Sequence, residues 1–361
     1  MKDKTKIKRF DERDTIFARM NYKKDTLEFD DYYNRNPNKR EIDEMLRAMP
    51  EMGGEGTVTH DPINSPIVDA CFRFLGDIRK FSVGTKQQDK GQLLDKDVMT
   101  ARIKGIAEFY NAKLVGIVEM KDYHYYSHRG RHTENYGEPI EANHKYGIVF
   151  AVEMDKDMIF QAPQLPEAIA VTKGYIDAAV IGMVLAYYIR ELGFEAINHM
   201  DGNYLIVAPL VAQDAGLGEI GRNGLLITDK YGPRVRLGVV TTDLPLTVDS
   251  PVELGITQFC RECEKCVKTC PGRAIPAGPE VEIDGLKRWR INPEECYKRW
   301  RALGTDCGIC LASCPFSDEI PQEYIKKMMV CGNARKEIRQ NHDKKHGVRP
   351  YLKDRPKWLE K

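Results

Sequence analysis

The sequence predicts an α+β protein with a second, cysteine-rich domain. Helix and strand signals alternate between residues 93 and 250, which predicts a layered body of the α/β or α+β type. Eight of the ten cysteines fall between Cys260 and Cys314, where the pattern changes to short helical turns. We therefore expect an irregular segment that wraps the core (1–92), a core (93–250), a cysteine-rich domain (251–321) and a basic extension (322–361).

Composition excludes several classes of protein. With 361 residues, 42% of them hydrophobic, the chain has ample material for a folded core. The net charge of +1 gives no electrostatic argument for nucleic-acid binding, and the longest apolar stretch, 178–189, is shorter than the ~20 residues of a membrane span. The start, MKDKTKIKRFDERD, shows no apolar segment and no twin arginine, which predicts a cytoplasmic protein unless a signal has been removed.

The first 92 residues are polar and interrupted by proline and glycine, so we expect no long periodic element there. One short helix is predicted at 65–81. Its apolar face would consist of Ile67, Ala70, Cys71, Phe74 and Ile78. On that face we expect Cys71 to be a buried, inert thiol.

Elements of the core follow in order from their hydrophobic patterns. A helix is expected at 98–112, then short β-branched strands at 113–120 and 145–154, which should be mostly buried. A long helix is expected over 165–192, closed by Gly193. A helix-like run with a glycine-rich end (209–224) precedes strands at 225–228 and 234–242.

The segment CRECEKCVKTCP has the spacing C-x2-C-x2-C-x3-C-P, which is the bacterial ferredoxin run for [4Fe–4S] clusters. In such runs three cysteines serve one cluster and the fourth serves another. Zinc is the competing interpretation, but this run places more cysteines in one loop than a tetrahedral site uses. The spacing therefore predicts two clusters. Cluster 1 takes Cys260, Cys263, Cys266 and Cys314; cluster 2 takes Cys270, Cys296, Cys307 and Cys310, of which Cys296 is the least securely placed.

Two other motifs in the core have the wrong context. Gly216, Gly218 and Gly221 spell G-x-G-x-x-G, with Asp243 further on, but here a helix precedes the glycines and a strand follows, opposite to a dinucleotide site. A glycine loop packed on another flat cofactor is the favoured alternative. Asp122 and His124 begin a D-x-H-x-x-G motif that is not completed, so His124 is expected at the surface or in a pocket.

Several stretches together resemble the corrinoid and iron–sulfur reductive dehalogenases. They are ERDTIFARM, KLVGIVEMKDYHYYSH, HKYGIVFAVEMD, AGLGEIGRNGLLITDKYGPRVRLGVVTTDLPL and the two cysteine motifs, in a similar order and spacing. The resemblance implies a nitroreductase-like core that binds base-off cobalamin, followed by a ferredoxin-like domain that reduces it. It also implies reductive removal of halide from a small organohalide, with electrons from an external low-potential donor of the ferredoxin or flavodoxin type.

The same resemblance implies catalytic residues. Tyr175 matches the proton donor near the start of the long helix, Asn203 matches a pocket amide, and an arginine of GPRVRLG matches the cation beside the tyrosine. We prefer Arg236 to Arg234, expecting the two on opposite faces of their strand, with one toward solvent or the cofactor tail. For the cofactor we expect contacts from the glycine loop, namely Gly216, Leu217, Gly218, Gly221, Arg222 and Asn223.

Two rival functions stay open. Epoxyqueuosine reductase shares the glycine loop and the cluster pattern, but its Asp-Tyr-His follows a strand corresponding to 145–154, whereas Asp122, Tyr123 and His124 precede that strand. A non-catalytic corrinoid or electron-transfer protein is the other rival. The substrate, the chemistry at cobalt and the oligomeric state do not follow from the sequence.

Overall fold

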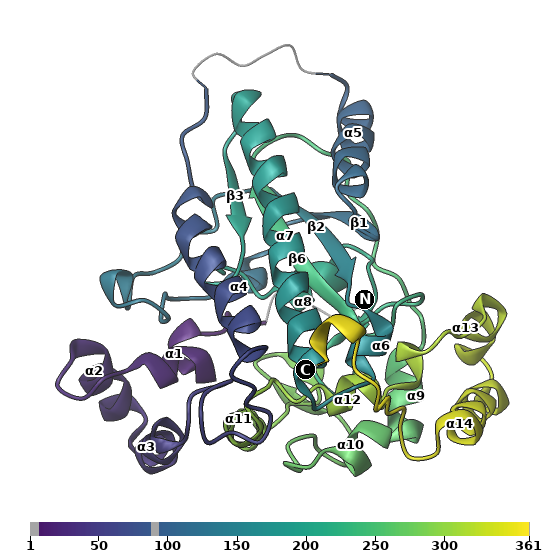
Figure 1. Ribbon diagram of the computed structural model, residues 1–361. Helices are drawn as coiled ribbons and strands as arrows, with labels where there is room; N and C mark the ends of the chain where they lie inside the picture. The colour runs from purple at the N-terminus through teal and green to yellow at the C-terminus, as the bar shows by residue number, and fades with distance from the viewer. Residues whose placement is uncertain (1–6, 88–93, 361) are drawn as a thin grey trace.

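The computed structural model describes residues 7–87 and 94–360 (Figure 1). Residues 1–6, part of the stretch used to judge export, lie outside the described residues. The main sheet has the strand order β1-β2-β6-β3, and each neighbouring pair is antiparallel. This pairing makes the core α+β rather than α/β. The strands are β1 (Leu114–Glu119), β2 (Tyr146–Glu153), β3 (Ala196–His199) and β6 (Val235–Thr242).

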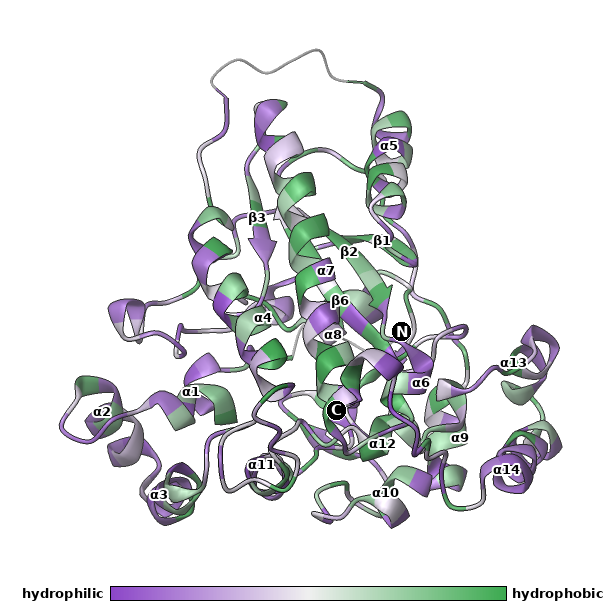
Figure 2. Cartoon of the chain, viewed as in Figure 1, coloured by the Kyte–Doolittle hydropathy of each residue, from purple (hydrophilic) through white to green (hydrophobic). Residues whose placement is uncertain are grey.

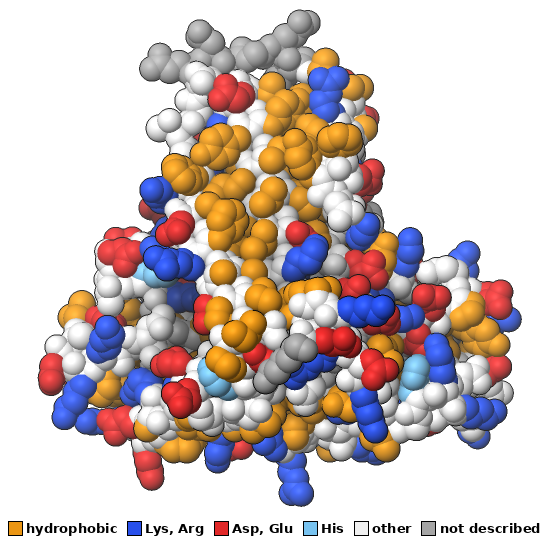
Figure 3. Space-filling model, viewed as in Figure 1, with side chains coloured by type: hydrophobic (Ala, Val, Ile, Leu, Met, Phe, Trp, Pro, Cys, Tyr) orange, Lys and Arg blue, Asp and Glu red, His pale blue; other side chains and the backbone are white. Residues whose placement is uncertain are grey.

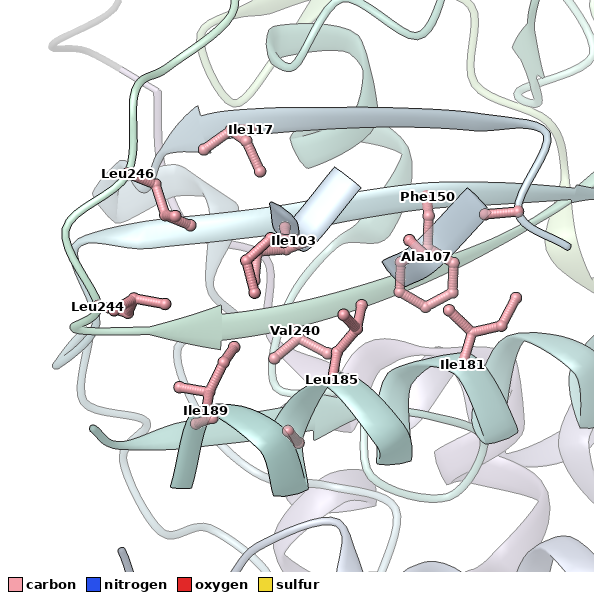
Figure 4. Close-up of a cluster of buried hydrophobic side chains, with 14 of the residues drawn as sticks. Ile103, Ala107, Ile117, Phe150, Ile181, Leu185, Ile189, Val240, Leu244 and Leu246 are labelled. Atoms are coloured by element: carbon pink, nitrogen blue, oxygen red, sulfur yellow. The ribbon is translucent and has the colours of Figure 1, made fainter. Parts of the chain in front are cut away.

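Both faces of this sheet are buried because β2 is apolar at consecutive positions. Ile148 and Phe150 face α7 (Leu165–Glu191) and α5 (Lys96–Phe109), while Val149 and Ala151 face α8 (Ala208–Asp214). Figure 4 shows side chains of α7 pointing into the first of these layers. Each such side chain contributes roughly 1.5–3 kcal/mol by burial. The two layers therefore fix the register of the sheet.

The long helix α7 is the central support of the core. Its sequence is mostly alanine, leucine, isoleucine and valine, and it ends before Gly193, whose φ of +84° terminates the helix. By length and composition α7 could cross a membrane, but 61% of its most apolar window is buried inside the protein. That burial identifies it as a core helix of this fold.

The amino-terminal segment contains more helix than expected. It forms α1 (Ile16–Asn21), α2 (Leu27–Arg35), α3 (Arg40–Ala48) and α4 (Ser65–Ile78). The first three are too short to show a clear period in the sequence. They are held by a buried ion pair, since Arg19 contacts Asp43 and donates to Glu294 in the cysteine-rich domain at 2.7 Å.

Helix α4 lies where predicted but presents a different face to the core. Leu75 is its buried apolar side chain and packs with Ala179 of α7. The expected apolar stripe is only partly covered: Ile67 and Ile78 pack on the core, but Ala70 and Phe74 are exposed, and Cys71 is half-buried rather than buried. The reason is that α4 lies on the outside of α7, so only one edge of it is covered.

The cysteine-rich domain consists of short helices and a hairpin, and the extension packs onto it. Ile325, Met328 and Ile338 of the extension share a cluster with Phe259 and Cys260. Although Figure 2 shows α14 as mostly hydrophilic, its inner face thus closes this domain. The elements are α9 (Ile256–Cys263), α10 (Lys265–Thr269), β7 (Val281–Ile283), β8 (Leu286–Arg288), α11 (Pro293–Leu303), α12 (Ile309–Ala312), α13 (Gln322–Met328) and α14 (Gly332–His346).

The last described residues return to the core. Leu359 packs against Leu165 and Ile169 at the start of α7, and the Leu359 carbonyl accepts a hydrogen bond from Asn64. The tail, predicted only as a basic extension, is therefore wrapped around the protein. The remaining short elements are α6 (Lys156–Ile159), β4 (Glu219–Ile220) and β5 (Leu226–Ile227).

Candidate functional site

Four cysteines line one cavity beneath α9 and α10. Glu264, with a φ of +53°, separates the two helices and turns the chain so that their thiols face the same space. Arg222 and Asn223 of the glycine loop line the same cavity. A soft, thiolate-rich set of donors fits an iron–sulfur cluster. The four are Cys260, Cys263, Cys266 and Cys314.

The other four cysteines form a second group beside the first. Burial, and then the neighbouring Cys270, raises the pKa of Cys296 to about 11. Burial likewise raises the pKa of Cys310 well above its usual range, and Cys296, Cys307, Cys266 and Cys270 act on it in the same direction. The influence of Cys266 on Cys310 shows that the two groups adjoin.

Tyr175 and Arg236 are brought together by close packing of α7 on β6. The Arg236 guanidinium carbon lies 4.0 Å from the centre of the Tyr175 ring. Gly174 permits this approach, because a Cβ there would lie 3.1 Å from the Cβ of Arg236. The Nε of Arg236 is buried and has no hydrogen-bond partner among the described residues. A buried donor of this kind is expected to have a partner in the working protein.

Arg234 has a different environment, although not for the expected reason. Residues two apart on a strand share a face, so alternation does not separate Arg234 from Arg236. Arg234 instead precedes β6 and is buried, donating to the carbonyl oxygens of Ser317 (2.7 Å) and Met154 (2.9 Å). The expectation that one arginine faces solvent or a cofactor tail is wrong for Arg234, which joins the core to the cysteine-rich domain.

Asn203 lies in the loop after β3, where its amide donates to Ser82 at 2.9 Å. The next residue, Tyr204, was not singled out from the sequence, nor was Arg131. Burial raises the pKa of Tyr204, and the nearby Tyr175 raises it further. Arg131 donates to Asp201 at 3.2 Å, and the charges of Asp201, Tyr175 and Tyr204 all raise the pKa of Arg131.

Tyr204, Arg131 and Arg236 form one neighbourhood around Tyr175. Each of the three is only partly covered, and burial and the charges of the others shift their pKa values. Arg131 also lies over the Phe17 ring of α1, at 5.5 Å from its centre, and Phe17 contacts Trp300 of α11. Arg131 is therefore linked through Phe17 to the helix that carries Cys296.

Two buried carboxyl groups connect this site to the second cysteine group. Burial, and then the charge of Asp306, raises the pKa of Glu167 well above its usual range, while Arg236 lowers it. Asp306 directly precedes Cys307, and Gly308 has no space for a side chain because Glu167 occupies it. The cysteine segment therefore packs directly against α7, two turns before Tyr175.

The glycine loop packs on protein along its length. A Cβ at Gly216 would lie 2.4 Å from the Ser250 carbonyl oxygen, and one at Gly218 would lie 2.3 Å from that of Ile227. Gly221 is equally crowded by the Ile227 side chain, and Leu217 is buried. These glycines are thus explained by close approach of the backbone, without a flat cofactor.

The remaining two loop residues face the cysteines. Arg222 donates to the carbonyl oxygens of Cys260, Pro276 and Gly278, and it stacks on Trp289. With Asn223 it lines the first cysteine cavity. The loop therefore fixes the position of that cavity relative to the core.

His124 is not a surface residue. It is fully buried, its Nδ1 accepts from the backbone of Lys121 at 3.0 Å, and its Nε2 lies 3.2 Å from Asp214. These contacts explain the histidine as part of the turn that follows β1.

Comparison with known proteins places the chain near two groups of enzymes. Residues 259–317 match the family model of a 4Fe-4S dicluster domain. Tetrachloroethene reductive dehalogenases of Desulfitobacterium hafniense and Sulfurospirillum multivorans are 37% and 35% identical over 181 and 177 residues, in each case 47% of this chain. An epoxyqueuosine reductase of Lactococcus garvieae is 30% identical over 159 residues, 40% of this chain and 44% of its own length.

Solved structures agree with the sequence comparison. A catabolic reductive dehalogenase in complex with 3-bromo-4-hydroxybenzoic acid superposes with a TM-score of 0.79 at 23% identity. The superposition covers 96% of this chain and 47% of the dehalogenase chain. A second reductive dehalogenase, described as B12-dependent, gives 0.72 at 25% identity, covering 84% and 46%. The chain spans about a third of the length of the curated dehalogenases it matches (32% and 35%).

Proposed function

Because the chain is related to the reductive dehalogenases, and more distantly to epoxyqueuosine reductase, we propose that it works as a corrinoid-dependent reductive dehalogenase-like oxidoreductase. The observation that carries this proposal is the contact of Tyr175 with Arg236 beside a group of four cysteines. Such a site combines a proton donor, a cation and a route for electrons. The proposal includes a nitroreductase-like core as the scaffold of the site.

We assign the cysteines to two [4Fe–4S] clusters. The first cavity supplies Cys260, Cys263, Cys266 and Cys314, and the second group supplies Cys270, Cys296, Cys307 and Cys310. The second group is the nearer to Tyr175, since Asp306 and Glu167 lie between them. Electrons from a small external donor of the ferredoxin or flavodoxin type would then enter through the first group.

In this proposal the corrinoid would bind against Arg131, Tyr204 and Arg236. The unpartnered Nε of Arg236 and the partly uncovered surfaces of all three residues fit a bound group there. When bound, a reduced base-off corrinoid supplies the strongly reducing centre that no side chain can supply. The glycine loop has a smaller part than expected, since its glycines pack on protein.

Removal of halide from a small organohalide consumes two electrons and one proton and releases a halide ion. In our proposal the Tyr175 hydroxyl donates that proton to carbon, and the Arg236 cation stabilises the phenolate that remains. In this proposal Asn203, whose amide donates to Ser82, orients the substrate. Phe72, with its ring centre 5.9 Å from that of Tyr175, covers one side of the tyrosine ring.

The test compares Tyr175→Phe with Tyr188→Phe, a half-buried tyrosine of the same helix that packs on the core. Both proteins are loaded anaerobically with cobalamin, iron and sulfide, and the loss of an aryl or alkenyl halide is followed with a chemical reductant. We expect Tyr175→Phe to keep both cofactors and to lose about 10²–10⁴-fold in turnover, as for a positioned general acid. Tyr188→Phe should retain activity.

Two results would contradict the proposal. Normal turnover by loaded Tyr175→Phe would move the proton donor elsewhere, and failure of the chain to take up cobalt would remove the corrinoid function altogether. Restoration of queuosine in a strain that lacks epoxyqueuosine reductase would favour the rival enzyme.

A further inference from the structure

One face of the protein exposes an unusual number of large apolar side chains. Figure 3 shows hydrophobic side chains gathered over α4, α7 and α5 on a single face. We call this the apolar helix face. Among the described residues, these three helices and the turn after α4 carry six large apolar side chains that are each between 40% and 85% exposed: Phe74, Phe81, Val98, Phe109, Val180 and Tyr187.

Part of this face is the stripe that the sequence predicted to be buried, because Phe74 of α4 is 43% exposed. On α5, Val98 and Phe109 are eleven residues apart and therefore lie on the same side of the helix. These apolar side chains have no role in the proposed reaction, and the described chain leaves at least 40% of each of them uncovered.

The outer side of α7 has the spacing of a helix-pairing seam. Its exposed and half-buried positions recur at intervals of four and three residues, which is the heptad spacing of two helices packed along their length. The middle of the seam is apolar and its ends are charged. The positions are Lys173, Asp177, Val180, Val184, Tyr187 and Glu191.

This seam is complementary to itself when a second copy runs antiparallel. With a two-fold axis at residue 182, Val180 lies opposite Val184 of the other copy. The same axis places Asp177 opposite Tyr187, a carboxylate that can accept from a hydroxyl, and Lys173 opposite Glu191, a pair of opposite charge. An interface built on a two-fold axis needs this kind of self-complementarity.

The size and composition of the face also suit a protein partner. With roughly 150–250 Å² for each buried aromatic ring, the exposed parts of the six side chains amount to about 500–600 Å². That is at the upper end for a patch on a monomer and close to the core of an interface of about 800 Å² per partner. The charged ends of the seam carry both signs, which suits pairing between two copies better than binding to an anionic membrane surface. In the dimer Lys173 would exchange its contact with Asp177 of the same helix for Glu191 of the other copy.

We propose that the apolar helix face binds a second copy of this chain, with the two α7 helices antiparallel and crossing near residue 182. The proposal does not depend on the reaction assigned above.

The experiment measures the mass of the intact chain in solution by sedimentation equilibrium. The protein concentration runs from 0.1 to 50 µM, so that it lies on both sides of a dimer Kd on the order of 1 µM. We expect twice the 41.3 kDa chain mass for the wild type. Val180→Glu brings two carboxylates near the axis and should weaken dimerisation at least 100-fold. Val281→Glu changes an equally small, 54% exposed valine on β7 and should leave the dimer intact.

A charge exchange tests the antiparallel register. Lys173→Glu alone should weaken the dimer several-fold, and Lys173→Glu combined with Glu191→Lys should recover most of that loss. Iron content and the circular dichroism of each variant report folding independently of association.

Three outcomes would overturn the proposal. They are a wild-type chain that stays monomeric at 50 µM, equal weakening by Val281→Glu and Val180→Glu, and binding of the monomer to lipid vesicles through this face. A chain that is monomeric but dehalogenates would contradict the interface and leave the proposed function in place.

Discussion

At the scale of single residues, the site depends on contacts that different elements make across the chain. The pairing of Tyr175 with an arginine was predicted from resemblance, and the structure places Arg236 on the tyrosine ring. Tyr204 and Arg131 could not be predicted, because nothing in a loop sequence indicates which residues of another loop it will meet. The only signal was proximity along the chain, because Tyr204 directly follows Asn203.

The two arginines provide a prediction at this scale. Arg236→Leu removes the cation from the tyrosine and should reduce turnover about as much as Tyr175→Phe, with little loss of stability. Arg234→Leu should act on folding instead, because it leaves the carbonyl oxygens of Ser317 and Met154 without their buried donor, at a cost of about 2–5 kcal/mol. Thermal unfolding and turnover per loaded protein separate the two effects.

The conservative variants serve as controls. Arg236→Lys keeps a charge and should recover part of the turnover. Equal losses of turnover in stable, loaded Arg234→Leu and Arg236→Leu proteins would mean that neither arginine is specific to the tyrosine.

At the scale of elements, long and strongly hydrophobic patterns were sufficient to predict helices and strands, and short or polar patterns were not. The strands at 113–120 and 145–154 and the helix at 165–192 were predicted within a few residues, since each is long and almost wholly apolar. Strand β3 was missed because it is four residues long and ends in Asn198 and His199, which are buried by hydrogen bonds rather than by hydrophobicity. The face of α4 was wrong because periodicity shows which side is apolar, not what covers it.

Helix α14 leads to a prediction about pH. Burial, followed by the charges of Lys265 and His346, lowers the pKa of His342 from 6.5 to about 4. Below pH 6.5 the unfolded chain therefore protonates His342 more readily than the folded chain does. The stability that neutral His342 contributes is complete above about pH 6.5 and is lost as the pH falls toward 4. Between pH 6.5 and 4.5 the wild type should lose about 2 kcal/mol more than His342→Leu.

Denaturant unfolding at both pH values measures this difference, and hydrogen exchange should show the loss in α14. His60→Leu changes an exposed histidine and should follow the wild type. Parallel pH profiles for the wild type and His342→Leu would show that protonation of this side chain is not linked to stability.

At the scale of the whole molecule, the order of segments was predictable and their arrangement was not. The sequence predicts a core followed by a cluster domain, but Arg19 reaches Glu294 across the chain, and no local pattern indicates such a pair. The near-neutral total charge also hides an uneven distribution, because residues 258–361 contain 22 lysines and arginines against 15 aspartates and glutamates.

The arrangement predicts how the loss of one cluster affects the whole enzyme. Cys263→Ala opens the first cavity, so about four of roughly eight irons should be lost and reduction of bound cobalamin by an external protein donor should slow. Cys71→Ala and Cys331→Ala change cysteines outside both groups and should leave the iron unchanged. Iron analysis and the visible spectrum report these outcomes. Loss of about four irons from Cys331→Ala, or none from Cys296→Ala, would show that the ligands are wrongly assigned.

The packing of Leu359 on Leu165 and Ile169 has a consequence for biosynthesis. A ribosome releases the chain from its amino end, so α7 emerges long before the residues that cover its first turns. The cysteine segment that lies against Glu167 also emerges before that cover. Iron, sulfide and a corrinoid therefore have access to a nascent polypeptide whose last cover is added only when synthesis reaches residue 359, whereas loading of a completed chain would require this carboxyl-terminal segment to move aside.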